Sequence, residues 1–240
     1  MRIVIDAGHG PETPGKRSPD GSLREYQFNS AVARYAADRL FTGYEGVDIM
    51  LTHDDSRDVP LKERTDRANA WVADLFVSIH ANAAGEGWSS AQGIETYVYE
   101  TRPPAAVALA NAVQRQLIRA TGRPDRGVKS ANFHVLRETR MTAILVECGF
   151  MTHREECELL KSDEYRRKCA EAIVAGIVET YGLKPKQTGQ TLPSDDWRAE
   201  FAAAREWAVE NGITDGSRPK DTVTREELWV MLYRAFGAKK

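Results

Sequence analysis

Residues 1–10, MRIVIDAGHG, predict a β-strand that runs directly into a tight turn. The run at 2–6 is rich in β-branched residues, which is typical of a strand. The turn at 7–10 carries two glycines, and glycine tolerates positive φ angles and close backbone approach. This turn places His9 at the carboxyl edge of the strand, where open α/β sheets bind their ligands. His9 is therefore a candidate functional residue, with a buried turn histidine as the structural alternative.

Outward from this stretch, strand-like and helix-like segments alternate along the chain. Apolar residues recur at helical spacing in some segments, and short apolar or alternating runs indicate strands in others. The expected helices cover residues 25–40, 61–73, 103–121, 155–160 and 165–181, and the expected strands cover 47–52, 75–80, 94–99 and 143–146. The alternating run at 94–99 predicts an outer strand. Together these segments predict an α/β fold with an open, twisted, mostly parallel sheet flanked by helices.

Composition and charge exclude several classes of function. The chain has 240 residues, of which 42% are hydrophobic and 28% charged, and its formal net charge is −2. This balance gives no basic surface for nucleic acid or an anionic membrane. No apolar run approaches the roughly 20 residues that span a bilayer. The chain opens on a strand without an apolar leader, so we expect synthesis in the cytoplasm without a signal peptide, and the three cysteines are expected to be reduced thiols.

Three further polar residues stand where elements begin or end. Glu25 opens the helix at 25–40, after a loop at 10–21 that is rich in glycine and proline. His80 ends the nearly continuous apolar run at 75–80, and Glu147 follows the apolar run at 143–146. An acidic residue in a first helical turn also favours the helix dipole, which is an ordinary role for Glu25. A buried glutamate is costly unless it is paired, so Glu147 either lies near a metal or pairs with an arginine.

Two histidines and two glutamates therefore mark the ends of separate elements. Two imidazoles and one carboxylate form the ligand set of many catalytic zinc sites, which keep a fourth position for water. A second carboxylate nearby would serve as a general base. The chain has no HExxH helix and no CxxC pair, so the sequence offers no local metal motif.

Several motifs stand in unbroken order over about residues 1–182. They are DAGHG at 6–10, Glu25 with Asn29, LTHDD at 51–55, the run 64–70 followed by ADLFVSIHANA at 73–83, and ILVECGF at 144–150. In these motifs the chain resembles the zinc-dependent N-acetylmuramoyl-L-alanine amidases of the amidase-3 type, a family that occurs in bacterial autolysins and phage endolysins.

The resemblance implies a zinc ion bound by His9, Glu25 and His80, with Glu147 as the catalytic residue. It also implies hydrolysis of the amide between N-acetylmuramic acid and L-alanine in peptidoglycan, which degrades the bacterial cell wall. Asn82 and His134 are the candidates for substrate binding. Two other classes stay open: a non-catalytic wall-binding protein, and a zinc peptidase that acts on the stem peptide.

The sequence departs from the family pattern at three positions. Pro11 stands where a further glycine is usual, His53 replaces a usual arginine, and His153 stands where asparagine is common. None of these departures removes an implied ligand, and His53 and His153 are expected to be structural or surface residues. Pro11 lies in the loop that leads to Glu25.

The composition changes after residue 183. Residues 184–193 read as a linker, because they combine polar residues with glycine and two prolines. EWAVENGITDG at 206–216 and VTREELWVMLYRAF at 223–236 resemble one unit of an S-layer homology domain, and such units bind cell-wall polymers. We therefore expect a catalytic domain at 1–183 and a small all-α domain at 194–240 that binds a secondary cell-wall polymer. A helical cap or a dimerisation unit is the alternative.

The resemblance and the missing leader together suggest where the enzyme acts. A chain made in the cytoplasm reaches the wall after release, either as a phage endolysin that passes a membrane lesion or after lysis of a mother cell.

Overall fold

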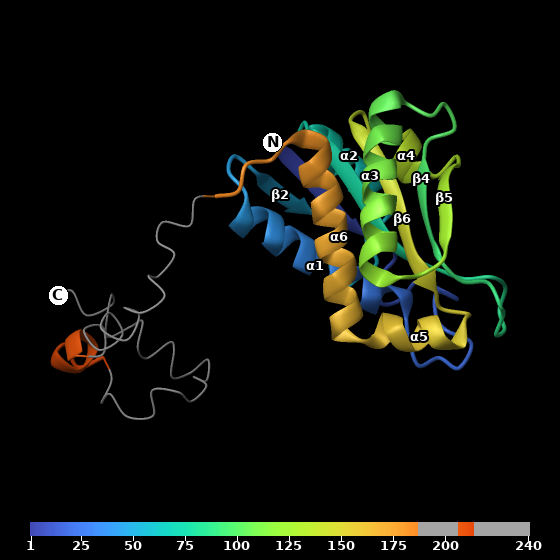
Figure 1. Ribbon diagram of the computed structural model, residues 1–240, viewed down its shortest axis with the longest axis horizontal. Helices are drawn as coiled ribbons and strands as arrows, with labels where there is room; N and C mark the ends of the chain where they lie inside the picture. The colour runs from blue at the N-terminus through green and yellow to red at the C-terminus, as the bar shows by residue number, and fades with distance from the viewer. Residues whose placement is uncertain (187–205, 214–240) are drawn as a thin grey trace. The chain divides into compact units, whose positions relative to one another are not determined.

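The computed structural model describes residues 1–186 and 206–213 of the chain (Figure 1). Among these residues, one sheet has the strand order β2-β1-β3-β6-β4-β5. Its strands are β1 Arg2–Ala7, β2 Asp48–Leu51, β3 Leu75–Asn82, β4 Ile94–Val98, β5 Asp125–Ser130 and β6 Thr142–Phe150. Strands β2, β1, β3 and β6 are mutually parallel, and β4 joins β6 in antiparallel pairing. This mostly parallel sheet confirms the predicted α/β class.

Helices cover both faces of the sheet. Their bounds are α1 Glu25–Gly43, α2 Leu61–Ala70, α3 Pro104–Thr121, α4 His134–Arg137, α5 Arg154–Lys161 and α6 Asp163–Tyr181. Figure 1 shows α1, α6 and α3 in front of the sheet, and residues of these three helices share one buried apolar cluster with the strands. A second, smaller cluster joins α2 and α4 to the opposite face. The sheet therefore has the two-sided cover that its apolar central strands require.

The two clusters follow from the alternation of side chains along the strands. In β3, Phe76 packs in the smaller cluster while its neighbours Leu75 and Val77 pack in the larger one. All three side chains are fully buried, and each such burial stabilises the fold by about 1.5–3 kcal/mol. A strand that is covered on both faces is a rigid support for the residues at its carboxyl end.

The run at 94–99 was expected as an outer strand, and this expectation is wrong. It forms β4, which lies between β6 and the true edge strand β5. The sequence of β5, DRGVKS, is polar and contains Gly127 with φ 76°, so it reads as a turn rather than as a strand. An edge strand tolerates such residues because one side of it faces solvent.

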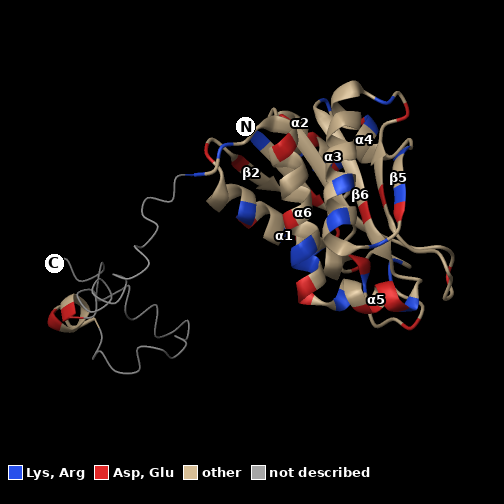
Figure 2. Cartoon of the chain, viewed as in Figure 1, with Lys and Arg blue, Asp and Glu red and all other residues tan. Residues whose placement is uncertain are grey.

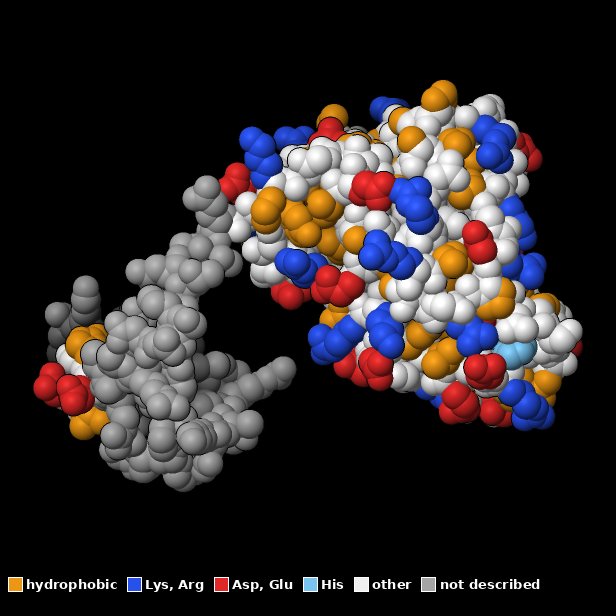
Figure 3. All heavy atoms as spheres, viewed as in Figure 1, with side chains coloured by type: hydrophobic (Ala, Val, Ile, Leu, Met, Phe, Trp, Pro, Cys, Tyr) orange, Lys and Arg blue, Asp and Glu red, His pale blue; other side chains and the backbone are white. Residues whose placement is uncertain are grey.

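The smaller apolar cluster covers only part of its face. It ends with Leu145 in β6 and with Tyr97 in β4. Two residues further toward the same edge, on the same face, stand Glu147 and Glu95, and the register pairs Glu147 with His80 of β3. A row of polar side chains therefore crosses the sheet beyond the cover of α2 and α4. On the face that Figure 3 shows, basic and acidic side chains are interspersed.

The chain divides after Lys186 into two units. Backbone hydrogen bonds join Lys184 to Glu45 and Lys186 to Gly43, at 2.9 and 2.8 Å, so the first residues of the expected linker pack on the first unit. In the second unit, the structure describes a helical turn at 206–210 that ends near Ile213, whose N–H donates to Ala208. The remainder of the expected all-α domain lies outside the described residues. Among the helices described, none is both long and apolar enough to cross a bilayer.

Candidate metal centre

The turn after β1 brings two histidines together. The Gly8 N–H donates to the Ile79 carbonyl at 2.9 Å, which ties the turn to β3. A Cβ atom on Gly8 would lie 2.0 Å from the His80 ring, so only glycine fits there. The positive φ angle falls on His9 itself, at 63°, and not on either glycine of the turn. Glycine is thus needed for close approach, as expected, while the strained backbone belongs to the histidine.

A buried ion pair supports this turn from below. Arg64 of α2 donates to Asp6 Oδ1 at 2.8 Å and to the His9 carbonyl at 2.9 Å, and it also donates to the Ala7 carbonyl. The Asp6 carboxylate accepts further hydrogen bonds from the hydroxyls of Ser78, at 2.6 Å, and Thr52. Burial raises the pKa of Asp6, but Arg64 and the two hydroxyls outweigh it and hold the pKa below its ordinary value. The fixed carbonyl of His9 holds the strained turn in place.

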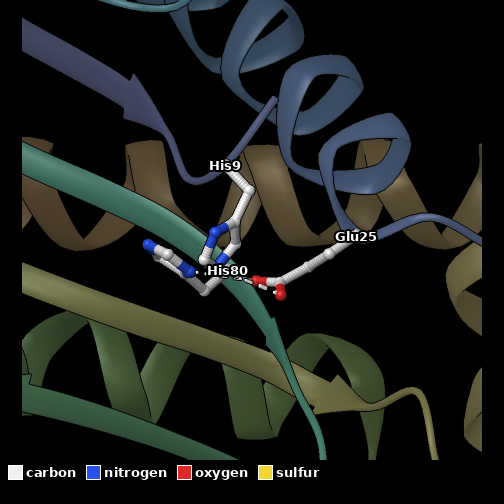
Figure 4. Close-up of side chains that lie close together, drawn as sticks. All are labelled: His9, Glu25 and His80. Atoms are coloured by element: carbon white, nitrogen blue, oxygen red, sulfur yellow. Dashed lines mark hydrogen bonds and ion pairs between the residues drawn. The ribbon is translucent and has the colours of Figure 1, made fainter. Parts of the chain in front are cut away.

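Glu25, in the first turn of α1, directs its carboxylate toward both histidines (Figure 4). Its Oε2 is 3.3 Å from His9 Nε2, and its Oε1 is 2.9 Å from His80 Nδ1. The two rings meet edge to face, with centroids 5.0 Å apart. One donor atom from each residue lies within 4.8 Å of the others. The structure therefore brings together the three residues that the sequence placed on separate elements.

One side-chain amide and one backbone N–H position the Glu25 carboxylate. The Asn29 amide donates to the Gly8 carbonyl at 2.9 Å and to Glu25 Oε1 at 3.2 Å, and the Ala81 N–H donates to the same oxygen at 3.2 Å. Burial raises the pKa of Glu25, but the hydrogen bond from His80 and the charge of His80 lower it overall. Burial lowers the pKa of His9 to about 4, so this imidazole is neutral at pH 7.

The hydrogen bonds of His80 test whether a cation fits this site. Ser78 Oγ donates its proton to Asp6, so it accepts from the His80 Nε2, which lies 3.2 Å away. Burial lowers the pKa of His80, but its hydrogen bond to Glu25 and the charge of Glu25 raise it overall, so without a metal a proton on Nδ1 joins this ring to Glu25 Oε1 at 2.9 Å. A neutral ring that keeps its proton on Nε2 presents a lone pair at Nδ1 instead. Two acceptors this close need a proton or a metal ion between them. Two imidazole nitrogens and one carboxylate are a donor set that suits such an ion.

Glu147 stands beside this group. Its position on β6 is paired with His80 across the β3–β6 ladder. The residue is partly exposed, but its Oε2 atom is buried and has no hydrogen-bond partner among the described residues. Burial raises the pKa of Glu147 to about 8, with His80 opposing the shift and the charge of Glu25 adding to it.

The remaining candidates lie outside the group of three. The Asn82 amide donates to Glu95 Oε1 at 2.8 Å, and His134 lies 3.3 Å from the Thr65 hydroxyl of α2. His53 lies 3.3 Å from the Ser30 hydroxyl, and His153 caps α5 by accepting the Glu156 N–H at 3.4 Å. The structure thus gives each of these side chains a local contact away from the proposed ligands.

Sequence reasoning missed two residues of this region, Arg64 and Glu95. Arg64 is almost fully buried, on the same face of α2 as the buried Ala68 four positions later. An arginine within the apolar stripe of an amphipathic helix is a signal of a buried partner, and it was available in the sequence. Glu95 is a buried charged residue between the buried Ile94 and Thr96 of β4, so its sequence position is likewise a signal of a buried partner.

Comparison with known proteins identifies the family of this chain. Residues 3–179 match the family model described as N-acetylmuramoyl-L-alanine amidase. The sporulation-specific N-acetylmuramoyl-L-alanine amidase of Bacillus subtilis is 30% identical over 220 residues, which cover 92% of this chain and 82% of that protein. The endolysin of Bacillus phage SPP1 is 33% identical over 196 residues, which cover 81% and 71% of the two chains.

A solved structure gives the same result. The catalytic domain of CwlV, an N-acetylmuramoyl-L-alanine amidase from Bacillus (Paenibacillus) polymyxa var. colistinus, is 35% identical with a TM-score of 0.71. The match covers 77% of this chain and 99% of that domain. Because the family model matches most of the chain and relatives cover it at 30% identity or more, the chain belongs to the N-acetylmuramoyl-L-alanine amidases, a family of hydrolases.

Proposed function

We propose that this amidase acts on peptidoglycan with a zinc ion held by His9, Glu25 and His80. The observation that carries the proposal is the convergence of donor atoms from the turn after β1, from α1 and from β3 to within 4.8 Å of one another. A zinc ion at this place supplies Lewis acidity, which polarises the scissile carbonyl and stabilises the negative charge that develops on its oxygen.

Glu147 is the residue that moves protons in this proposal. Its Oε2, which has no hydrogen-bond partner among the described residues, would accept a proton from the attacking water while the water oxygen bonds to the carbonyl carbon. The ionised form that this step needs would be favoured by the positive charge of a zinc ion, which lowers the raised pKa of Glu147. The C–N bond then breaks, and Glu147 delivers its proton to the departing nitrogen. The products are the carboxylic acid of the lactyl group and the free amino group of L-alanine. Asn82 and His134 are proposed to contact the substrate beside this centre.

Metal analysis tests the proposed ligands. We expect the full chain to hold one zinc ion per molecule, to lose activity on chelation and to regain it with zinc. His80→Ala should lose both zinc and activity. His153→Ala is the matched control. His153 caps α5 through one hydrogen bond, so the protein with this substitution should keep its zinc. Full zinc content in His80→Ala would contradict the assignment.

Product analysis tests the reaction. Mass spectrometry of digested peptidoglycan should show peptides with a free L-alanine amino group and glycan without new reducing ends. A peptidase would instead leave L-alanine attached to the muramoyl group. A non-catalytic wall-binding protein would sediment with the wall and release nothing.

We propose that the enzyme acts at the cell wall after release from the cytoplasm of the cell that makes it. Two relatives support this place of action, because one is named an endolysin and another a sporulation-specific amidase.

The C-terminal residues are proposed to tether this enzyme to a secondary cell-wall polymer. Support comes from the S-layer-like sequence and from Trp207, which is 56% exposed in the described turn of helix. A tether raises the local enzyme concentration at an insoluble substrate. A chain of residues 1–186 should cleave soluble muropeptides normally and sediment less with whole walls. Equal sedimentation would refute the tether, and conversion of a dimer to a monomer would assign the tail to oligomerisation instead.

A further inference from the structure

Glu95 is a buried carboxylate with a donor for each of its lone pairs. Its Oε1 accepts from the Asn82 amide at 2.8 Å and from the Tyr97 hydroxyl at 2.7 Å. Its Oε2 accepts from Arg126 Nε at 2.6 Å and from Lys129 Nζ at 2.5 Å. Two cations of β5 are thus fixed over the sheet by one acidic group.

These two cations carry more charge than Glu95 neutralises. One of them balances the Glu95 carboxylate, so within this cluster of three side chains one positive charge remains. The Glu95 side chain is 3% exposed, whereas those of Arg126 and Lys129 are 35% and 39% exposed. Figure 2 shows the basic residues of β5 at the edge of the sheet.

Both cations keep hydrogen-bonding capacity. Within the described residues, the Lys129 ammonium has Glu95 as its hydrogen-bond partner, which leaves two of its three protons for a ligand. The Arg126 guanidinium lies over the Phe150 ring at 4.8 Å and donates to the Gln92 carbonyl at 3.3 Å, so its plane is held in one orientation. A pre-oriented guanidinium and an ammonium suit the recognition of a carboxylate.

The separation between the cations and the reacting amide determines which residue of the substrate peptide can contact them. Glu95 lies directly opposite Glu147 in the β4–β6 pairing, one strand spacing away, which is about 4.8 Å. An extended peptide advances about 3.3–3.6 Å per residue, so a group on the second residue beyond the cleaved bond lies about 7 Å from it. Lys129 Nζ contacts the Glu95 carboxylate at 2.5 Å, so it lies beside the strand next to that of Glu147, in the range that this second residue can reach.

We infer that Arg126 and Lys129 bind a carboxylate of the substrate peptide, on the residue that follows L-alanine. This inference rests on the proposed function. Binding of this carboxylate by the two cations also sets the orientation of the substrate across the sheet. The muramoyl arm has no charge once its lactyl group forms the amide, so the arm that meets the two cations is the peptide.

Binding measurements with two matched probes test this assignment. One probe is a soluble muramoyl-L-alanyl peptide whose second residue carries one free carboxylate, and the other has a carboxamide in its place. The protein is the zinc-loaded full chain with Glu147→Gln, which binds substrate without turning it over. Calorimetry should give a Kd for the carboxylate probe that is lower by about tenfold or more, because charge-assisted hydrogen bonds discriminate at this level.

Variants of Lys129 separate recognition from structure. Lys129→Met should abolish the preference by weakening the carboxylate probe alone, and Lys129→Arg should restore it. Lys168→Met is the matched control, because Lys168 pairs with Glu164 on the exposed face of α6 and should keep the preference. Equal loss for both probes, or no preference in the parent chain, would overturn the inference. Failure of the chain with Glu147 intact to cleave either probe would refute the proposed function, and the binding preference would still be read independently.

Discussion

Glu95 and Glu147 face each other on neighbouring strands, and they differ in their hydrogen bonds. Glu95 accepts from four side chains, two of which are cations, and these lower its pKa to about 2 despite its burial. Glu147 has a buried oxygen without a partner in the described part of the chain, and burial raises its pKa to about 8. Two residues of the same type, on adjacent strands, therefore have opposite electrostatic environments.

The difference separates a structural carboxylate from a reactive one. Burying a carboxylate without partners costs several kcal/mol, so a fold keeps such a group only with compensation elsewhere. Asp6 resembles Glu95, because Arg64 and two hydroxyls satisfy it. Of the three carboxylates Asp6, Glu95 and Glu147, the one with an oxygen unpartnered by any described residue is Glu147, beside His9, Glu25 and His80. Groups with perturbed pKa values at such places are candidates for acid–base catalysis.

The sharpest test of the comparison exchanges the reactive carboxylate for its amide. Glu147→Gln keeps the shape and loses the proton acceptor, so kcat should fall by about 10²–10⁴-fold. Zinc content and wall binding should stay at the level of the parent chain. Steady-state kinetics on soluble muropeptide, with metal analysis of the same sample, measures both. Near-normal turnover would show that Glu147 is not the base.

Removing the partner of a satisfied carboxylate should instead destabilise the protein. Arg64→Met leaves Asp6 buried and unpaired, and we expect a loss of about 3–5 kcal/mol in the free energy of unfolding. Denaturant titration followed by circular dichroism measures it. Lys62→Met on the same helix is the control, because its ion pair with Asp66 is exposed and should contribute nothing measurable. If Asp6→Asn fails to recover stability in the Arg64→Met background, the pair is not the cause.

The pH dependence of stability should show the role of Glu95. Its pKa is about 2 in the folded protein and near 4.5 ordinarily, so the folded state favours the ionised form. The stabilisation is fully present above pH 4.5 and is lost as the pH falls through 2, and it amounts to at most about 3 kcal/mol. The difference in unfolding free energy between the parent chain and Glu95→Gln should therefore shrink between pH 4.5 and 2. A constant difference across this range would argue against the ion-pair account.

The smallest effect is expected at His134. Its ring contacts the Thr65 hydroxyl at 3.3 Å, and His134→Ala should cost about 0.5–1.5 kcal/mol of stability for that hydrogen bond. Zinc content and kcat should not change, while KM reports any contact with substrate. A fall in kcat as large as that of Glu147→Gln would show that His134 takes part in proton transfer. Glu147 would then not be the sole acid–base group, and its contrast with Glu95 would no longer explain catalysis.

The sequence predicted the parts of the fold that depend on local pattern. The strands that end at Ala7, Asn82 and Phe150 are apolar runs, and β-branched runs of this kind have few alternatives. The polar edge strand β5 was missed, because solvent satisfies one side of it and no apolar pattern is needed. The sequence also placed His9, Glu25 and His80 at element ends, and the structure brings them together.

What the sequence did not supply is the support of the site. The partners Asp6 and Arg64 are separated along the chain, and only the packing of α2 on the sheet shows that they meet. The same holds for Glu95, whose cations come from the unrecognised strand β5. Local pattern identifies residues that carry chemistry, whereas long-range pairing decides which charges surround them.

The place of β6 in the sheet has a consequence for the timing of folding. β6 lies between β3 and β4, although it follows both β4 and β5 along the chain. A nascent chain that ends before β6 already contains His9, Glu25 and His80, but not Glu147. Pairing between strands that are distant in sequence is slow, so we expect the β6 amides to gain protection from hydrogen exchange late in refolding. A ribosome-bound fragment that ends before β6 contains the three proposed ligands. The proposed proton acceptor joins them only after β6 has paired with β3 and β4.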